Sequence, residues 1–125
     1  MSDQRHVARV KLFQSLFAAT FLTDTKHIKR VKNSKLDQLL TLIPTIDQKL
    51  SQGAPERPLT EVNKVDLAIL RLIMFESMQT DTPVKVLINE GVELAKTFGS
   101  ESSSKFVNGV LGKLLIDDQK ESTNE

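Results

Sequence analysis

The sequence contains no cysteine, tryptophan or tyrosine, and it has only five glycines and two histidines among its 125 residues. The absence of cysteine excludes disulfides, thiolate metal sites and a cysteine nucleophile, and it fits the reducing conditions of the cytoplasm. The few glycines form neither a P-loop nor a dinucleotide fingerprint, and a pair of histidines is too little for a metal cluster. No apolar run reaches the ~18 residues of a membrane span. We therefore expect no membrane segment, no metal and no cofactor.

Signatures of an enzyme are also missing. The carboxylates at Asp66, Glu76, Glu90 and Glu93 lie in segments with helical periodicity, where acidic side chains are common, and nothing marks them as catalytic. The serines of residues 100–104 have no histidine near them in the sequence, so we interpret them as helix caps. We predict a protein without catalytic activity.

Charge is distributed unevenly, although the formal net charge is only +1. Residues 1–35 carry eight basic and two acidic side chains, a net +6, and the remaining ninety residues carry a net −5. Phosphates respond to the local potential, so a nearly neutral protein with one basic end can bind a nucleic acid. Lysine-rich segments are also ordinary solvated surface, and charge alone leaves both interpretations open.

Apolar side chains recur at three- and four-residue spacing along most of the chain, which predicts helices. The expected helices cover residues 3–22, 34–50, 61–79, 83–98 and 103–116. One more helical turn is possible in the basic segment between the first two. Apolar side chains cover nearly the full circumference of the helix at 61–79, which is typical of a central, surrounded helix. The predicted fold is all-α, with five to six helices in one compact domain over residues 1–116. Residues 117–125 are polar, and we expect a disordered tail.

Several residues suggest where these helices begin, bend and end. Asp3 and Thr60 are predicted N-caps, as is Ser34, which stands three residues before Asp37. Gly99 is a predicted C-terminal glycine. Pro44 interrupts the second helix and predicts a kink or a break, with the unbroken apolar phase favouring a kink. Within the last segment, residues 109 and 112 are glycines, which cost helix stability, so we expect them to permit close helix contact.

Two features are candidates for contact with a nucleic acid. Arg5, His6 and Arg9 lie at the start of the first helix, where the histidine is better suited to donate to a phosphate than to bind a metal. Lys105 and Phe106 lie at the start of the last helix, where free backbone N–H groups favour an anion. The phenylalanine is either a core residue or a stacking platform for a base.

Three longer segments, with their order and spacing, identify a resemblance. They are Val65-Asp-Leu-Ala-Ile-Leu-Arg-Leu-Ile-Met-Phe-Glu76, Pro83-Val-Lys-Val-Leu-Ile-Asn-Glu-Gly-Val-Glu-Leu-Ala-Lys-Thr-Phe-Gly99 and Ser104-Lys-Phe-Val-Asn-Gly-Val-Leu-Gly-Lys113. They resemble the C-terminal half of the NusB family of bacterial transcription antitermination factors. The opening helix, with Arg5-His-Val-Ala-Arg9, is similar to the basic helix of that family, whereas residues 23–61 match it poorly.

The resemblance implies a cytoplasmic, all-α, non-enzymatic RNA-binding protein. Its ligand would be the boxA element, a single-stranded RNA of ribosomal-operon transcripts. It would bind this RNA together with NusE, a small-subunit ribosomal protein, and so support processive transcription by RNA polymerase. Family members occur as monomers and homodimers, and the sequence does not decide between these states.

The resemblance also implies roles for individual residues. Arg5, His6 and Arg9 match the RNA-contacting segment of the first helix. The second contact region is expected to contain Ser102, Lys105 and Phe106, with Ser104 beside them. Asp66 and Arg71 fall where the long central helix would face NusE.

Three departures from the family pattern affect the expected affinity and RNA preference more than the fold. His6 stands where an arginine is usual, Phe17 replaces a tyrosine, and Ser102 and Ser104 replace acidic or histidine side chains. The first helix begins with fewer arginines than is usual in the family. This motivates an alternative, a helical protein-interaction module of the transcription or ribosome-assembly machinery with little RNA contact. NusB-like domains also occur fused to RNA methyltransferases, but we expect a chain that ends at residue 125 to have no catalytic domain.

Overall fold

The computed structural model describes residues 4–21 and 31–116, and this part of the chain contains five α-helices and no strand. The helices are α1 (Gln4–Ala19), α2 (Lys35–Gly53), α3 (Lys64–Gln79), α4 (Val84–Phe98) and α5 (Ser103–Leu111), and a π-helical segment, Gly112–Ile116, continues α5. The all-α prediction is confirmed. The expected cap at Asp3, the end of the first helix at Leu22, the basic residues 26–30 and the tail 117–125 lie outside the described residues.

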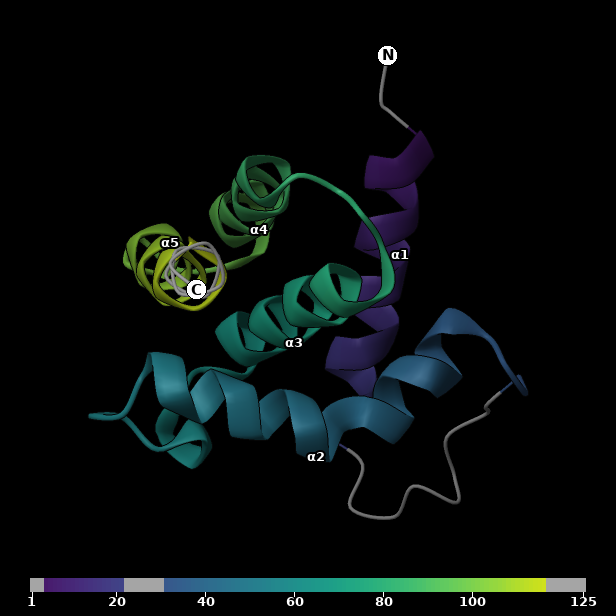
Figure 1. Cartoon of the computed structure of the whole chain (residues 1–125), viewed down its shortest axis with the longest axis horizontal. Helices are drawn as coiled ribbons and strands as arrows, with labels where there is room; N and C mark the ends of the chain where they lie inside the picture. Colours follow the sequence, from purple (N-terminus) through teal and green to yellow (C-terminus); the bar gives the residue numbers. More distant parts are fainter. Residues whose placement is uncertain (1–3, 22–30, 117–125) are drawn as a thin grey trace, which may run out of the picture.

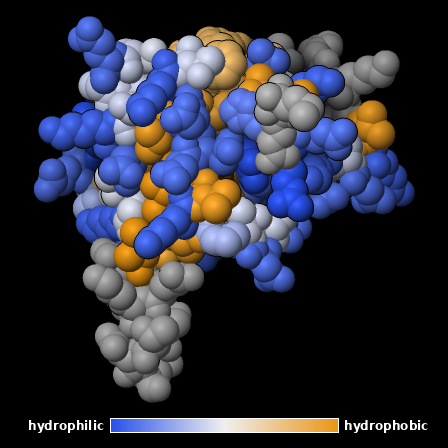
Figure 2. All heavy atoms as spheres, turned by 90° about the horizontal axis from the view of Figure 1, so that it is seen from above, coloured by the Kyte–Doolittle hydropathy of each residue, from blue (hydrophilic) through white to orange (hydrophobic). Residues whose placement is uncertain are grey.

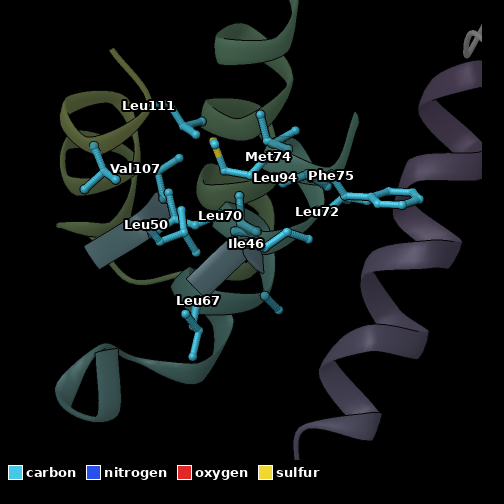
Figure 3. Close-up of a cluster of buried hydrophobic side chains, with 14 of the residues drawn as sticks. Ile46, Leu50, Leu67, Leu70, Leu72, Met74, Phe75, Leu94, Val107 and Leu111 are labelled. Atoms are coloured by element: carbon cyan, nitrogen blue, oxygen red, sulfur yellow. The ribbon is translucent and has the colours of Figure 1, made fainter. Parts of the chain in front are cut away.

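Helix α3 is the centre of the fold, because α1, α2, α4 and α5 all pack against it. Figure 1 shows α2 running below α3, with α1 on one side of α3 and α4 and α5 on the other. Ile69, Leu72 and Ile73 are fully buried, as the apolar circumference of this segment predicts. In Figure 3, Phe75 points from α3 toward α1, while Val107 and Leu111 belong to α5, on the opposite side of α3. The core therefore lies around α3, and the polar sites lie at the edges of its neighbours.

Helix α2 begins as its sequence suggests and continues through its proline. The Ser34 Oγ accepts a hydrogen bond from the Asp37 N–H at 3.1 Å, and Asp37 Oδ2 accepts one in return from the Asn33 N–H at 3.0 Å. The helix then runs without interruption to Gly53, with Pro44 inside it. A break at this position is therefore excluded. Because Pro44 is exposed, water can reach the carbonyl that the proline leaves without an intrahelical donor.

The start of α3 differs from the sequence prediction. Thr60 does not cap it, because Leu59–Glu61 form a separate 3₁₀ turn. The cap is Asn63, whose Oδ1 accepts hydrogen bonds from the N–H groups of Val65 at 2.8 Å and Asp66 at 3.4 Å. An asparagine and a threonine three residues apart are both acceptable caps, and the 3₁₀ turn that contains the threonine leaves the asparagine at the start of the helix.

The glycines that permit close helix contact are not the predicted ones. A Cβ added at Gly109 or Gly112 would meet no heavy atom within 4 Å, so that expectation was wrong. Close approaches occur at Gly53 of α2, where an added Cβ would lie 2.6 Å from Leu114 Cγ, and at Gly91 of α4, where it would lie 2.8 Å from Leu111 Cδ1. A Cβ at Gly91 would also lie 3.3 Å from Ile73 Cγ1. Gly91 therefore lets α4 pack closely on α3 and α5, and Gly109 needs another explanation.

Candidate nucleic-acid interface

The basic residues at the start of α1 lie over two carboxylates from other helices. Arg9 Nε donates to Glu76 Oε2 of α3 at 2.7 Å, and Arg9 Nη1 lies 3.6 Å from Glu90 Oε1 of α4. His6 Nδ1 lies 3.0 Å from Glu90 Oε2, and since a carboxylate only accepts, Nδ1 carries the proton. This cluster joins α1, α3 and α4 through charged groups at the edge of the core.

The ion pairs change the role expected for Arg9. Its side chain is only 8% exposed, so the guanidinium is directed to Glu76 and Glu90 and not to solvent. Arg5, one turn earlier, is exposed, and the His6 side chain is 39% exposed. The sequence places the two arginines on the same side of α1, but only the packing of α3 and α4 distinguishes the buried one. The surface that a ligand can reach at this end of α1 is therefore formed by Arg5 and His6.

A large groove runs beside this cluster. It has a volume of about 1160 Å³ and lies between α1, the start of α2, the end of α3 and the start of α4. Its cationic walls include Arg5, Lys11 and Lys35, while Glu76, Asp81 and Glu90 add negative charge. We call it the α1 groove. Its mixed charge makes it a weaker polyanion site than the composition of residues 1–35 suggests.

The predicted residues of the second contact region lie together in another groove. Ser102, Lys105 and Phe106 line a hollow of about 680 Å³ between α5 and the loop that follows α2. The same hollow is lined by Arg57 from the loop and by Lys113 from the π-helical segment that continues α5. We call it the α5 groove. It shares no lining residue with the α1 groove, so the structure groups the two sets of predicted residues separately.

Phe106 is partly buried, and its ring is covered by a cation. It packs against the hydrophobic core, which accounts for the apolar pattern of the segment. The Arg57 Cζ lies over the ring, 4.7 Å from the centroid. Phe106 therefore contacts the core with one part of its ring and an exposed arginine with another, and its stacking on a base stays a prediction.

The sequence interpretation missed Arg57 and Lys113. Lys113 stands eight residues after Lys105, which puts both on one face of a helix, so its spacing was a usable signal. Arg57 lies in the loop between α2 and the 3₁₀ turn, and no local pattern connects that loop with α5. Only the tertiary contact with Phe106 reveals it.

The serines before α5 form a local network. The Ser103 hydroxyl accepts a hydrogen bond from the Ser100 N–H at 2.9 Å, and Ser103 is fully buried. Ser102 stands at the N-cap position but makes no capping hydrogen bond, and it is exposed in the α5 groove. The serine cluster thus orders the turn between α4 and α5 and leaves one hydroxyl toward the groove.

Asp66 and Arg71, the residues expected to face a protein partner, have little free surface. Arg71 forms a bidentate ion pair with Asp47 of α2, with N–O distances of 2.9 and 2.8 Å. Asp66 is 6% exposed, and its Oδ1 has no hydrogen-bond partner among the residues that the structure describes. Two charged residues of α3, Arg71 and Glu76, thus form salt bridges with other helices, Arg71 with Asp47 and Glu76 with Arg9.

Neither a candidate metal centre nor a candidate membrane-spanning helix is found in the part of the chain that the structure describes. Within residues 4–21 and 31–116, no group of three His, Cys, Asp or Glu side chains could hold a metal ion. None of the helices in these ranges is long and apolar enough to cross a membrane. Figure 2 shows the face seen from above in Figure 1, which is mostly hydrophilic, with an apolar strip interrupted by hydrophilic side chains.

Comparisons with known proteins agree with this architecture. The NusB family model matches residues 6–115. The transcription antitermination protein NusB of Chloroflexus aggregans is 47% identical over 92% of this chain and 89% of its own length. The NusB of Roseiflexus castenholzii is also 47% identical, but over 56% of this chain, and the match spans about half (51%) of that relative. A solved structure of T. maritima NusB superposes with a TM-score of 0.79 at 28% identity, covering 94% of each chain. The chain belongs to the NusB family.

Proposed function

We propose that this protein is a non-enzymatic transcription antitermination factor that binds boxA-like single-stranded RNA together with NusE. It would act in the cytoplasm as part of the RNA polymerase antitermination complex. Membership of the NusB family and the names of the relatives support the role in antitermination. The finer statements, that the ligand is boxA-like RNA and that NusE is the partner, rest on the family resemblance and on the charge of the α5 groove.

The observation that carries the proposal is the set of cations in the α5 groove. Arg57, Lys105 and Lys113 are exposed, and none of them has a carboxylate within ion-pair distance in the described part of the chain. Glu56 is the single acidic residue of the lining. Three unpaired cations around an aromatic ring match the chemistry of single-stranded RNA, which offers phosphates and unstacked bases.

The α1 groove would supply a second, weaker contact. Arg5 is exposed there, and the ring nitrogen of His6 that does not face Glu90 is available for a hydrogen bond with the RNA. Arg9 would act indirectly, because its ion pairs hold the start of α1 against α3 and α4. Asp66 and Arg71 remain proposed contacts to NusE, with small exposed areas.

Titration of a labelled boxA-like RNA at two salt concentrations, with and without NusE, tests the proposal. Binding should weaken as salt rises, because phosphate contacts release counterions. Lys105→Gln should reduce the slope of log affinity against log salt by about 0.7, the value for one contact to a single strand. Lys49→Gln is the matched control, since Lys49 is exposed on α2 and lines neither groove. Absence of binding at low salt with NusE present would refute the proposal.

A helical protein-interaction module with little RNA contact is the second candidate. Two observations favour it: Arg9 is buried, and three carboxylates line the α1 groove. Both weaken the positive potential there. This candidate predicts that NusE is captured equally by the wild type and by an Arg5→Gln/Lys105→Gln variant. It also predicts that neither protein binds the RNA.

A further inference from the structure

The α5 groove contains a geometry that phosphate binding alone does not use. The guanidinium of Arg57 lies over the Phe106 ring, 4.7 Å from its centroid, and Arg57 is exposed. The guanidinium therefore lies against the ring while the exposed Arg57 side chain lines the groove. A planar guanidinium is itself a stacking surface for nucleic-acid bases.

Gly109 provides a second, independent observation. It lies within α5, where a glycine costs about 1 kcal/mol relative to alanine. No side chain packs against it, since an added Cβ would meet nothing within 4 Å. Its backbone has no positive φ that would demand glycine. Gly109 is exposed and lines the α5 groove, so a missing side chain there leaves room for a ligand against the helix.

The cations are arranged around this open position. Lys105, Gly109 and Lys113 follow one another at intervals of four residues, so they form one stripe along the helix face. All three line the same groove as Arg57. A strand that lies over Gly109 would have an ammonium group on either side along the helix and the Arg57 guanidinium in the same groove.

We infer that Arg57 is a stacking platform for one unpaired base of the RNA, with the Phe106 ring behind the guanidinium. The ribose-phosphate backbone passes over Gly109, between Lys105 and Lys113. This inference rests on the proposed RNA-binding function and adds to it the recognition of a base in the α5 groove. The same pair also attaches the loop to α5, and a purely structural role would affect stability without affecting recognition of any base.

The test compares the wild type with Arg57→Lys, which keeps the positive charge and removes the planar group. Both are titrated with boxA-like RNA and with a series of the same RNA in which each nucleotide in turn is abasic. For the wild type, one abasic position should reduce affinity by about 5- to 50-fold, in the range of loss for a stacked base. For Arg57→Lys, intact RNA should bind more weakly by a similar factor, and that abasic position should cost less than twofold. The salt slope should remain unchanged, and Lys49→Gln should behave as the wild type.

A second variant tests the path over the helix. Gly109→Gln adds a side chain to the groove without a clash inside the protein, and it should weaken RNA binding about tenfold or more. Asn108→Gln is the neighbouring control, since Asn108 is exposed on α5 and does not line the groove. Thermal melts establish that each variant is folded.

The outcomes separate this inference from the proposed function. If Arg57→Lys binds every RNA of the series as the wild type does, the platform is refuted and RNA binding stands. A uniform loss that leaves the abasic pattern unchanged refutes stacking and shows only a contact through the hydrogen-bond donors of the guanidinium. Unchanged binding by Gly109→Gln refutes the path over the helix. If the wild type binds no RNA at low salt, with or without NusE, the proposed function fails and the inference fails with it.

Discussion

At the scale of single residues, charge has to be considered together with burial. Arg5 and Arg9 are the same residue type, one turn apart on α1, yet one is exposed and the other lies under two carboxylates. A buried arginine with charged partners is costly to remove, because its partners lose their counter-charge inside the protein. The chemistry of the side chain was evident in the sequence, and its environment was not.

Arg9→Ala should lower the free energy of unfolding by about 2–3 kcal/mol, somewhat less than the ~3–5 kcal/mol for a fully buried pair. The Glu76 and Glu90 side chains are 16% and 21% exposed, so in the variant water can partly solvate the charges that lose their arginine. Urea titration followed by circular dichroism measures the change. Lys11→Ala, at an exposed position of the same helix, should change stability by less than about 0.5 kcal/mol. Equal effects of the two substitutions would contradict a structural role for the ion pairs.

At the scale of helices, local sequence patterns predicted which segments form helices. The folded structure then decided which of several suitable residues caps a helix or allows two helices to pack closely. The apolar circumference of α3 correctly indicated a surrounded helix, and the cap at Ser34 was visible from its spacing to Asp37. The start of α3 at Asn63 followed the 3₁₀ turn just before it, and the glycines used for close packing depended on contacts with other helices. Such contacts have no signature within a window of ten or fifteen residues.

Replacement of glycine by alanine should have opposite effects on stability in α4 and in α5. Gly91→Ala should destabilise the protein by about 1 kcal/mol or more, because the new methyl group lies 2.8 Å from Leu111 Cδ1 in a fully buried environment. Gly109→Ala should stabilise it by about 0.5–1 kcal/mol, because alanine favours the helix and meets nothing within 4 Å. Thermal melts of both variants under the same conditions provide the comparison. A stabilising Gly91→Ala would show that α4 and α5 are not in close contact there.

At the scale of the whole molecule, the candidate site consists of two grooves. The α1 groove and the α5 groove have no lining residue in common, and their charge differs, with carboxylates abundant in the first and a single one in the second. The excess of basic residues in 1–35 therefore does not identify the better RNA site. The more cationic groove lies on the segment of the chain with net negative charge, because folding brings Arg57 to α5.

If one RNA strand engages both grooves, Arg5→Gln and Lys105→Gln should weaken binding additively, within about 0.5 kcal/mol, as independent sites do. The double variant should reduce the salt slope by about 1.4, twice the value for one phosphate. Fluorescence anisotropy across a salt series measures both quantities. An Arg5→Gln variant with an unchanged slope would show that the RNA uses the α5 groove alone.

The sequence by itself determined the all-α class, the segments that form helices, the central position of α3 and, through three motifs, the family. These follow from periodicity and from residue order, which are local or collinear properties. The tertiary structure decided which cations remain free, because pairing depends on what another helix presents at a distance of about 3 Å. It turned Arg9 inward to Glu76 and Glu90, occupied Arg71 with Asp47, and placed Arg57 over Phe106. Each of these contacts joins residues at least 24 positions apart, a separation that only folding removes.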